Sequence, residues 1–274
     1  MRVILILTDG LRPDAVTPGR MPFLHQLADE HVVALSATTV RPSTTVAALA
    51  TLATGLEPET HGLLEPGLGF LRRLAQLEPL PRALARAGIR TRIVASDLPP
   101  IQRRVAPLLA AAAGVATFRC VGTQAREVAA GALDVAAGGG RQMLFVYLND
   151  CDRAGHTHGW MSPEYLEAAV ELDAAVGLLA PLAASSLLVI LADHGGGGVV
   201  PTHHREPHPL NDAIPLVLAG PDVERRRRLT DPVSIVDVPP TMCHWLGVPV
   251  PDTFEGRVLT EAFARPAAPV ALPA

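Results

Sequence analysis

The chain has 274 residues, of which 49% are hydrophobic and 18% charged, and its formal net charge is -4. This composition predicts a compact, single-domain protein, and the weak negative charge excludes the basic surface that binding to a nucleic-acid polymer requires. The three cysteines, Cys120, Cys151 and Cys243, are widely spaced without a CxxC pair, which excludes a structural zinc site built on thiolates.

Short apolar runs recur along the chain, each followed by a helical pattern. We predict strands at residues 3–7, 91–96, 143–148, 187–192 and 214–220. We predict helices at residues 21–29, 46–54, 80–87, 101–113, 124–136, 163–180 and 236–246. The apolar runs are continuous rather than alternating, so the strands should be covered on both faces. The sequence therefore predicts an α/β fold with a mainly parallel central sheet and helices on both faces.

The predicted elements form one domain over residues 1–263, and the Pro- and Ala-rich segment 264–274 is expected to be a loose tail. The first apolar run is too short for a signal peptide or a membrane span. We therefore expect a cytoplasmic protein without a membrane partner, and the sequence predicts no particular oligomeric state. The arginine run 225–228 is expected to be a solvated surface, with an anion-binding rim as the alternative.

Carboxylate and imidazole residues stand where predicted strands end. Asp9 follows the first strand, Asp152 and His156 follow strand 143–148, and Asp193 and His194 follow strand 187–192. Ligands in open α/β sheets bind beyond the carboxyl ends of the strands, so these side chains should converge. Converged and unpaired they would repel one another or lose hydration, whereas a cation between them would remove that cost. Oxygen and nitrogen ligands without thiolate favour zinc, with manganese or iron as alternatives.

Further histidines precede the last predicted strand. His203, His204 and His208 lie in the segment "THHREPHPLND", residues 202–212. Each is a candidate for an additional metal ligand, and one of them could contact substrate instead.

A candidate nucleophile lies in the polar loop "RPSTT" before the small-residue helix 46–54. Thr44 or Thr45 is placed at the helix N-terminus, where free backbone N–H groups and the helix dipole favour a phosphate. A threonine hydroxyl is a poor nucleophile at neutral pH, and a nearby dication would activate it by stabilising the alkoxide.

In this order and spacing, the motifs resemble the alkaline phosphatase superfamily, and most of all its bacterial type I phosphodiesterase and nucleotide pyrophosphatase-like branch. The motifs are "TDG" (8–10), "PSTTVAALATLATGLEPETHG" (42–62), "DRAGHTHG" (152–159), "ADHGGGG" (192–198), "IPLVLAGP" (214–221) and "SIVDVPPTMCHWLGVPVP" (234–251). Together they cover nearly the whole chain.

The resemblance implies an alkaline phosphatase-like fold and two divalent metal ions. The first site would comprise Asp9, Thr45, Asp193 and His194, and the second Asp152, His156 and His204. His203 and His208 remain alternatives to His204, and Asp150 is the alternative to Asp152. Thr45 rather than Thr44 would be the nucleophile, and a covalent phosphothreonine would be hydrolysed by water. The substrate would be a small phosphate monoester or diester.

One departure from the branch concerns the substrate. Diesterase relatives carry an asparagine that contacts a phosphoryl oxygen, where this chain has Glu65 and Pro66. Arg41, Asn149 or Arg205 could supply that contact. The alternative functions are a metal-dependent phosphomutase and a non-catalytic metal- or anion-binding homologue. A sulfatase would need a modified cysteine or serine in a CxPSR-like motif, and "RPSTT" has no cysteine.

Overall fold

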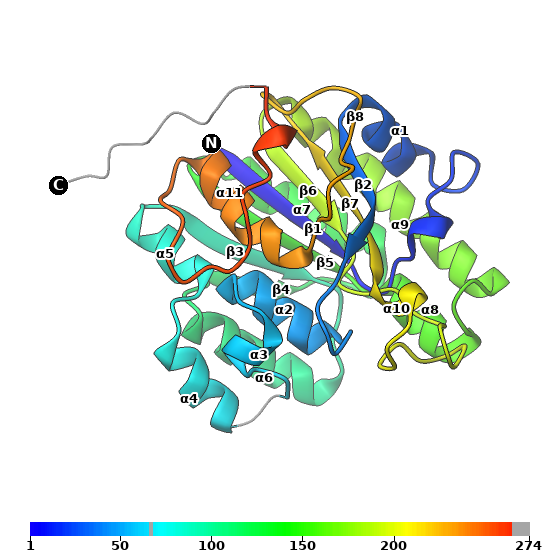
Figure 1. Ribbon diagram of the computed structural model, residues 1–274, viewed down its shortest axis with the longest axis horizontal. Helices are drawn as coiled ribbons and strands as arrows, with labels where there is room; N and C mark the ends of the chain where they lie inside the picture. The colour runs from blue at the N-terminus through cyan, green and yellow to red at the C-terminus, as the bar shows by residue number, and fades with distance from the viewer. Residues whose placement is uncertain (66–67, 265–274) are drawn as a thin grey trace.

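The computed structural model describes residues 1–65 and 68–264, and its centre is an eight-stranded sheet with the strand order β4-β3-β5-β1-β6-β7-β2-β8 (Figure 1). The strands are β1 (Arg2–Thr8), β2 (Val32–Thr38), β3 (Arg90–Ala95), β4 (Thr117–Cys120), β5 (Gln142–Leu148), β6 (Leu187–Leu191), β7 (Ala213–Ala219) and β8 (Arg227–Arg228). The helices are α1 (Pro22–Glu30), α2 (Thr45–Thr54), α3 (Pro58–His61), α4 (Leu68–Gln76), α5 (Leu80–Arg86), α6 (Pro100–Ala112), α7 (Ala125–Ala137), α8 (Asp150–His158), α9 (Pro163–Leu179), α10 (Pro209–Asp212) and α11 (Val238–Leu246).

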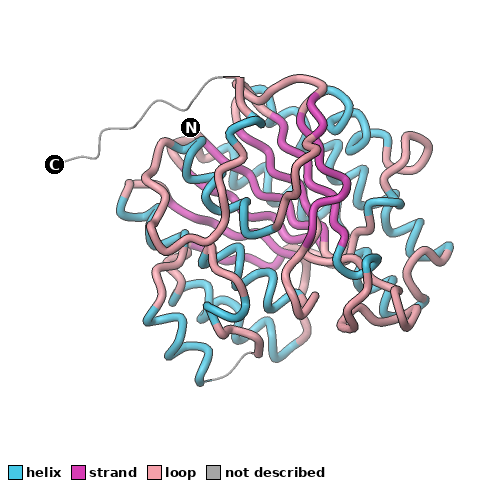
Figure 2. Tube along the Cα trace, in the orientation of Figure 1, coloured by secondary structure: helices cyan, strands magenta, loops and turns pink. Residues whose placement is uncertain are grey.

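Helices cover both faces of the sheet, as predicted. On one face α1, α7 and α9 pack together and against strands β2, β3, β5 and β7. On the other face α2, α5 and α11 pack together and against β1 and β3, and Figure 1 shows α11 in front of the strands. The strands form the middle layer in Figure 2. Because both faces are covered, the central strands β1 and β6 are almost entirely buried, which explains their continuous apolar runs.

The direction of the strands decides which segments reach the functional edge. Strands β1, β3, β4, β5 and β6 run parallel to one another, so the prediction of a mainly parallel sheet is confirmed. Strand β7 runs antiparallel to both β6 and β2. Its beginning therefore lies beside the carboxyl end of β6, and the connection between these two strands returns to the same edge of the sheet.

Most of the strands and helices that were not predicted lack a clear apolar period. Strands β4 and β8 are short edge strands that are only partly buried or exposed, and β2 shifts register between Ala34 and Ala37. Helix α8 was also missed, because its sequence "DCDRAGHTH" is polar and contains Gly155. The short helices α3 and α10 were also missed, as was α4, although α4 is amphipathic.

Several expectations concern the surface and the ends of the chain. Pro66 and the tail residues 265–274 lie outside the described residues, and the single-domain boundary at residue 263 stays a prediction. No helix in the part of the chain that the structure describes is long and apolar enough to cross a membrane. Arg227 and Arg228 are exposed in β8, and Arg225 contacts the ring of His31. The three cysteines are free thiols, as expected.

Candidate metal centre

The carboxyl ends of three neighbouring strands bring the predicted carboxylates together. Asp9 directly follows β1, Asp193 follows β6 by two residues, and Asp152 lies in the first turn of α8, after β5. Backbone hydrogen bonds connect these segments: the amide of Asp9 donates to the carbonyl of Leu148 (2.8 Å), and that of Asp152 to the carbonyl of Asp9 (3.1 Å). The amide of Gly10 donates to Asp193 Oδ1 at 3.2 Å. The strand-end rule therefore placed all three carboxylates correctly at one edge.

Helix α8 presents two of the predicted ligands on one face. Asp152 and His156 are one helical turn apart, and His156 Nε2 lies 3.3 Å from Asp152 Oδ1. Between them, Gly155 lies against the ring of Trp160, where a Cβ atom would be 2.6 Å from the indole carbons. Trp160 is buried and its indole N–H donates to the carbonyl of Gly10 at 2.8 Å. This close packing fixes α8 against the loop that carries Asp9.

His204 and Thr45 belong to segments other than the three strand ends that carry the carboxylates. His204 lies in the connection between β6 and β7, and its ring Nδ1 donates to the carbonyl of Ser43 at 2.6 Å. In return, Ser43 Oγ donates to the carbonyl of His204 at 2.5 Å. Thr45 is the first residue of α2, and its Oγ1 lies 3.3 Å from His194 Nε2. These contacts join the nucleophile loop to the predicted ligands of both metal ions.

The three predicted histidine ligands share one hydrogen-bonding arrangement. In each ring Nδ1 contacts a backbone carbonyl: Thr202 for His156 (2.9 Å), Gly195 for His194 (2.8 Å) and Ser43 for His204 (2.6 Å). A carbonyl only accepts, so Nδ1 carries the proton, and Nε2 of the neutral ring is left as a lone-pair donor. The Nε2 atoms of His156 and His204 face each other at 3.2 Å. When both rings are neutral, two lone pairs at that distance repel, and a cation between them would remove the repulsion.

The carboxylates show a matching pattern of paired and unpaired oxygens. Asp9 Oδ2 accepts from the hydroxyl of Tyr147, and Asp193 Oδ1 accepts from the amides of Gly10 and His194. In contrast, Asp9 Oδ1, Asp152 Oδ1 and Asp193 Oδ2 are buried, and no described residue donates a hydrogen bond to them while the ring of His194 is neutral. Buried polar atoms are rarely left unpaired, so three at one site call for a bound partner. A divalent cation fits these oxygens and the Nε2 atoms.

The donor atoms fall into two groups whose members lie within 4.8 Å of one another. One group comprises Asp152, His156 and His204, and the other Asp9, Asp152 and His194. The first is the predicted second metal site. The other differs from the predicted first site because Asp152 takes part in it, while Asp193 Oδ2 lies 3.6 Å from His194 Nε2. The structure thus brings together all seven predicted site residues, whose roles as ligands or nucleophile stay predictions.

The charges of this cluster shift the pKa values of its members. Burial, followed by the charges of Asp193 and Asp152, raises the pKa of Asp9 well above its usual value. Burial alone would lower the pKa of His194, but Asp193, Asp9 and Asp152 outweigh it and raise the pKa to about 10. Burial and then the charge of His194 lower the pKa of His204 to about 3. The negative potential is therefore strong enough to hold a proton on the buried ring of His194.

The alternative ligands lie outside both groups. Asp150 Oδ1 accepts from the guanidinium of Arg153 at 3.2 Å. His203 is exposed, and its Nδ1 lies 3.0 Å from the hydroxyl of Thr202. His208 caps α10, since its Nδ1 accepts from the amide of Leu210 at 3.1 Å. The geometry thus favours Asp152 over Asp150 and His204 over its two neighbours.

The three candidates for the missing phosphoryl contact occupy different positions. Arg41 forms an ion pair with Asp212 (2.5 Å), although its side chain remains largely exposed. Arg205 is exposed directly after His204, and Asn149 is buried at the N-terminus of α8.

Sequence reasoning missed the residues that support the predicted ligands. They are Tyr147, which donates to Asp9; Thr39, whose hydroxyl donates to the carbonyl of Asp193; and Ser43. Burial, followed by the charges of Asp9 and Asp193, raises the pKa of Tyr147 well above its usual value, so its hydroxyl stays a donor. A polar residue near the end of the predicted strand 143–148 was the one available signal for Tyr147.

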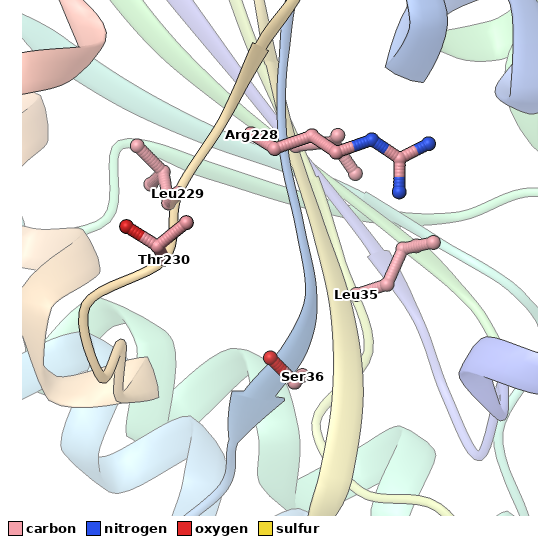
Figure 3. Close-up of a pocket in the computed structure, with 6 residues that line it drawn as sticks. Leu35, Ser36, Arg228, Leu229 and Thr230 are labelled. Carbon is pink, nitrogen blue, oxygen red and sulfur yellow. The ribbon is translucent and has the colours of Figure 1, made fainter.

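Two surface hollows lie away from the two donor groups. One, of about 390 Å³, lies beside β2 and β8 and is lined by Val33, Leu35, Ser36, Arg228, Leu229 and Thr230 (Figure 3). The other, of about 470 Å³, lies between α8 and α9 and is lined by several acidic side chains, including Asp150 and Glu167. Neither includes a residue of the two donor groups.

Comparisons with known proteins identify similar chains. The family model for type I phosphodiesterase / nucleotide pyrophosphatase matches residues 3–67 and 102–257. The catalytic subunit of GPI ethanolamine phosphate transferase 3 from Mus musculus is 25% identical over 295 residues, covering 96% of this chain and 26% of that protein. The chain thus spans about a quarter of the length of this curated relative.

Solved structures with low sequence identity share the fold. Human ectonucleotide pyrophosphatase / phosphodiesterase 5 has a TM-score of 0.74 at 15% identity, covering 97% of this chain and 100% of that chain. A 2-O GAG sulfatase has a TM-score of 0.75 at 14% identity, covering 96% and 74% respectively. A phosphonate monoester hydrolase from Silicibacter pomeroyi has a TM-score of 0.71 at 14% identity, covering 94% and 75%. The expected alkaline phosphatase-like fold is confirmed.

Proposed function

Because the chain belongs to the type I phosphodiesterase / nucleotide pyrophosphatase family, we propose that it hydrolyses small phosphate esters through Thr45 at a site for two divalent cations. The membership agrees with the resemblance found in the motifs. Zinc is the first candidate for both ions, and manganese and iron are the alternatives, because the donors are carboxylate oxygens and imidazole nitrogens without thiolate.

The convergence of unpaired donor atoms supports this proposal most directly. Three buried carboxylate oxygens without a hydrogen-bond donor, on Asp9, Asp152 and Asp193, meet the Nε2 atoms of histidines that are oriented by backbone carbonyls. A structural polar cluster would pair these oxygens internally. Unpaired oxygens that face one another beside a half-buried threonine hydroxyl are typical of a catalytic site that binds cations.

The residues divide between the two cations as follows. Asp9, Asp193, His194 and Thr45 would hold one, and Asp152, His156 and His204 the other, with Asp152 near both. When bound, the cations would neutralise charge on the phosphoryl group and favour the ionised hydroxyl of Thr45.

The position of Thr45 supports its proposed role as the nucleophile. It is the first residue of α2, and no side chain caps this helix, because Thr44 makes no capping hydrogen bond. The free N–H groups and the positive end of the helix dipole would therefore stabilise the negative charge of a phosphoryl group bound at Thr45. The Thr45 hydroxyl loses its proton as its oxygen forms a bond to phosphorus, and the bond to the leaving oxygen breaks. The leaving oxygen takes up a proton from solvent and departs as an alcohol. Water then attacks the phosphothreonine, releasing phosphate or a phosphomonoester and restoring the hydroxyl.

The matched pair Thr45→Ala and Thr44→Ala tests the assignment of the nucleophile. The assay compares a nitrophenyl phosphate monoester with the matching diester, after metal analysis of the purified protein. Thr45→Ala should lower kcat by about a thousandfold or more while keeping most of the bound metal, whereas Thr44→Ala should retain most activity. Turnover by Thr45→Ala at the wild-type rate would refute Thr45, and a wild-type protein without metal would refute the two-cation site.

Product analysis separates hydrolysis from the other reactions of a phosphothreonine. Water gives free phosphate or a phosphomonoester, whereas an alcohol acceptor gives a new ester and a mutase gives an isomer of the substrate. The assay should therefore be repeated with added ethanolamine and with a phosphorylated sugar, and the products identified by phosphorus NMR. Transfer in preference to hydrolysis would replace the hydrolase proposal by a transferase, and isomer formation by a mutase.

A further inference from the structure

The hydroxyl of Tyr147 contacts the metal cluster but has no part in the proposed reaction. Tyr147 is the penultimate residue of β5, and it pairs with Leu7 of β1 and Ala95 of β3 in the middle of the sheet. The amide and the hydroxyl of Ser96 both contact its carbonyl, at 2.9 and 3.2 Å. The backbone of Tyr147 is therefore held on both sides, which fixes the origin of its side chain.

This hydroxyl occupies one oxygen of a predicted ligand. It donates to Asp9 Oδ2, and the other oxygen, Oδ1, is buried without a donor, 3.2 Å from His194 Nε2. A carboxylate with both oxygens free could turn about its terminal torsion, which is broad. The hydrogen bond to Tyr147 removes this freedom and leaves Oδ1 directed at the donor cluster.

Asp193 shows the same arrangement with a different donor. Backbone amides of Gly10 and His194 hold its Oδ1, and its Oδ2 is the unpaired oxygen beside the cluster. In both carboxylates, therefore, one oxygen accepts hydrogen bonds and the other faces the donor cluster. For Asp9 the hydrogen-bond donor is the side chain of Tyr147, so a substitution of Tyr147 can remove this bond without changing Asp9.

We propose that Tyr147 is a positioning residue for metal binding, whose hydroxyl holds Asp9 so that Oδ1 faces the cation. The inference rests on the proposed function only in requiring that the cluster binds a cation. Hydrogen-bond partners of metal ligands are typically worth about 10- to 100-fold in metal affinity.

The variant Tyr147→Phe tests this role, and Tyr165→Phe is its matched control. The hydroxyl of Tyr165 is buried beside Gly10, where it donates to the carbonyl of Gly10 and accepts from the amide of Arg12, both at 2.9 Å. It contacts no predicted ligand side chain. Both variants thus lose one phenol hydroxyl that hydrogen-bonds the Asp9–Gly10 segment, but only Tyr147→Phe releases a carboxylate.

The measurement is the affinity for zinc, by competition with a chromophoric chelator, together with the visible absorption spectrum of the cobalt-loaded protein. Tyr147→Phe should raise the zinc Kd about 10- to 100-fold and change the cobalt bands, whereas Tyr165→Phe should change the Kd by less than about threefold. Thermal melting of the metal-free proteins reports the structural cost of each lost hydroxyl. A wild-type Kd in Tyr147→Phe, or equal losses of affinity in both variants, would overturn the inference.

The result is separable from the test of the proposed function. A wild-type protein that binds zinc but hydrolyses no ester would end the hydrolase proposal, while the difference in Kd between the two variants would still support the positioning role. A wild-type protein that binds no divalent cation would overturn both.

Discussion

The metal affinity of the donor group formed by Asp9, Asp152 and His194 should rise about tenfold for each unit of increasing pH. The negative charges of Asp193, Asp9 and Asp152 outweigh burial and raise the pKa of His194 to about 10, so the metal-free protein carries an imidazolium there at neutral pH. A cation needs the lone pair of Nε2, so the proton on that atom must leave as the metal binds.

The magnitude follows from this one proton. Below a pKa of about 10, the fraction of His194 with a free Nε2 rises tenfold per pH unit, so the apparent Kd should fall about 100-fold from pH 6.5 to 8.5. The raised pKa of Asp9 acts in the same direction. The pKa of His204 is lowered to about 3, so this ring has no proton to release in that range.

The stability of the metal-free protein should change with pH in the opposite sense. The folded-state pKa of His194, about 10, lies above the ordinary histidine pKa of 6.5. Its contribution to stability is therefore complete below pH 6.5 and is lost as the pH rises through 10. The melting temperature of the metal-free protein should fall over that interval, while bound metal offsets the loss.

Zinc titrations at several pH values, corrected for the chelator's own protonation, measure the slope. Calorimetry in buffers of different ionisation enthalpy counts the protons released. The variant His194→Asn is the control, because it keeps an amide near the Gly195 carbonyl but has no titrating ring. A wild-type affinity that is independent of pH, or an unchanged slope in His194→Asn, would refute the reasoning.

Asp173→Ala should lower the free energy of unfolding by about 3 kcal/mol, because the buried carboxylate accepts the amides of Phe23 (3.1 Å) and Leu24 (2.8 Å) at the start of α1. Urea unfolding measures this, and a loss below about 0.5 kcal/mol would contradict the capping role. Gly10→Ala should cost about 2 kcal/mol or more, since Gly10 has a φ of 69° and an added Cβ would lie 2.9 Å from the Cα of Asp152. Its thermal melting should fall clearly below that of the wild type, and an unchanged melting temperature would contradict the close approach. Removing metal present at about 1,000 times its Kd should lower the melting temperature by about 8–16 °C per site, from about 4.1 kcal/mol of binding energy. Scanning calorimetry with and without chelator tests this, and equal curves would exclude a cation bound to the native state.

The centre of the fold and most of the site were predictable because their signals are local. Strands β1, β5, β6 and β7 are continuous apolar runs, and the rule that ligands gather at strand ends selected Asp9, Asp152 and Asp193 without any knowledge of strand order. Edge strands such as β4 bury too little for such a run. Helix α8 has no apolar stripe, because one of its faces carries ligands and Gly155 packs against Trp160.

The supporting contacts depend on the order of the strands, which no local pattern contains. Tyr147 reaches Asp9 only because β5 lies beside β1, and Ser43 reaches His204 only because β7 reverses direction. The position of Asp152 between both donor groups depends on side-chain geometry across three elements. The sequence pattern indicated only an ordinary helix residue at Asp173. Its capping role was not predictable, because its hydrogen-bond partner Phe23 lies 150 positions away at the start of another helix.

Because β7 runs antiparallel to β6, several predicted metal ligands lie in the one segment that connects these strands. Residues 192–212 carry Asp193, His194 and His204, and the carbonyl of Thr202 in the same stretch orients His156. Residues 199–201 of this stretch are exposed. A single proteolytic cut there would separate ligands of both cations at once, and bound metal, by tying the stretch to α8 and β1, would shield it from the protease.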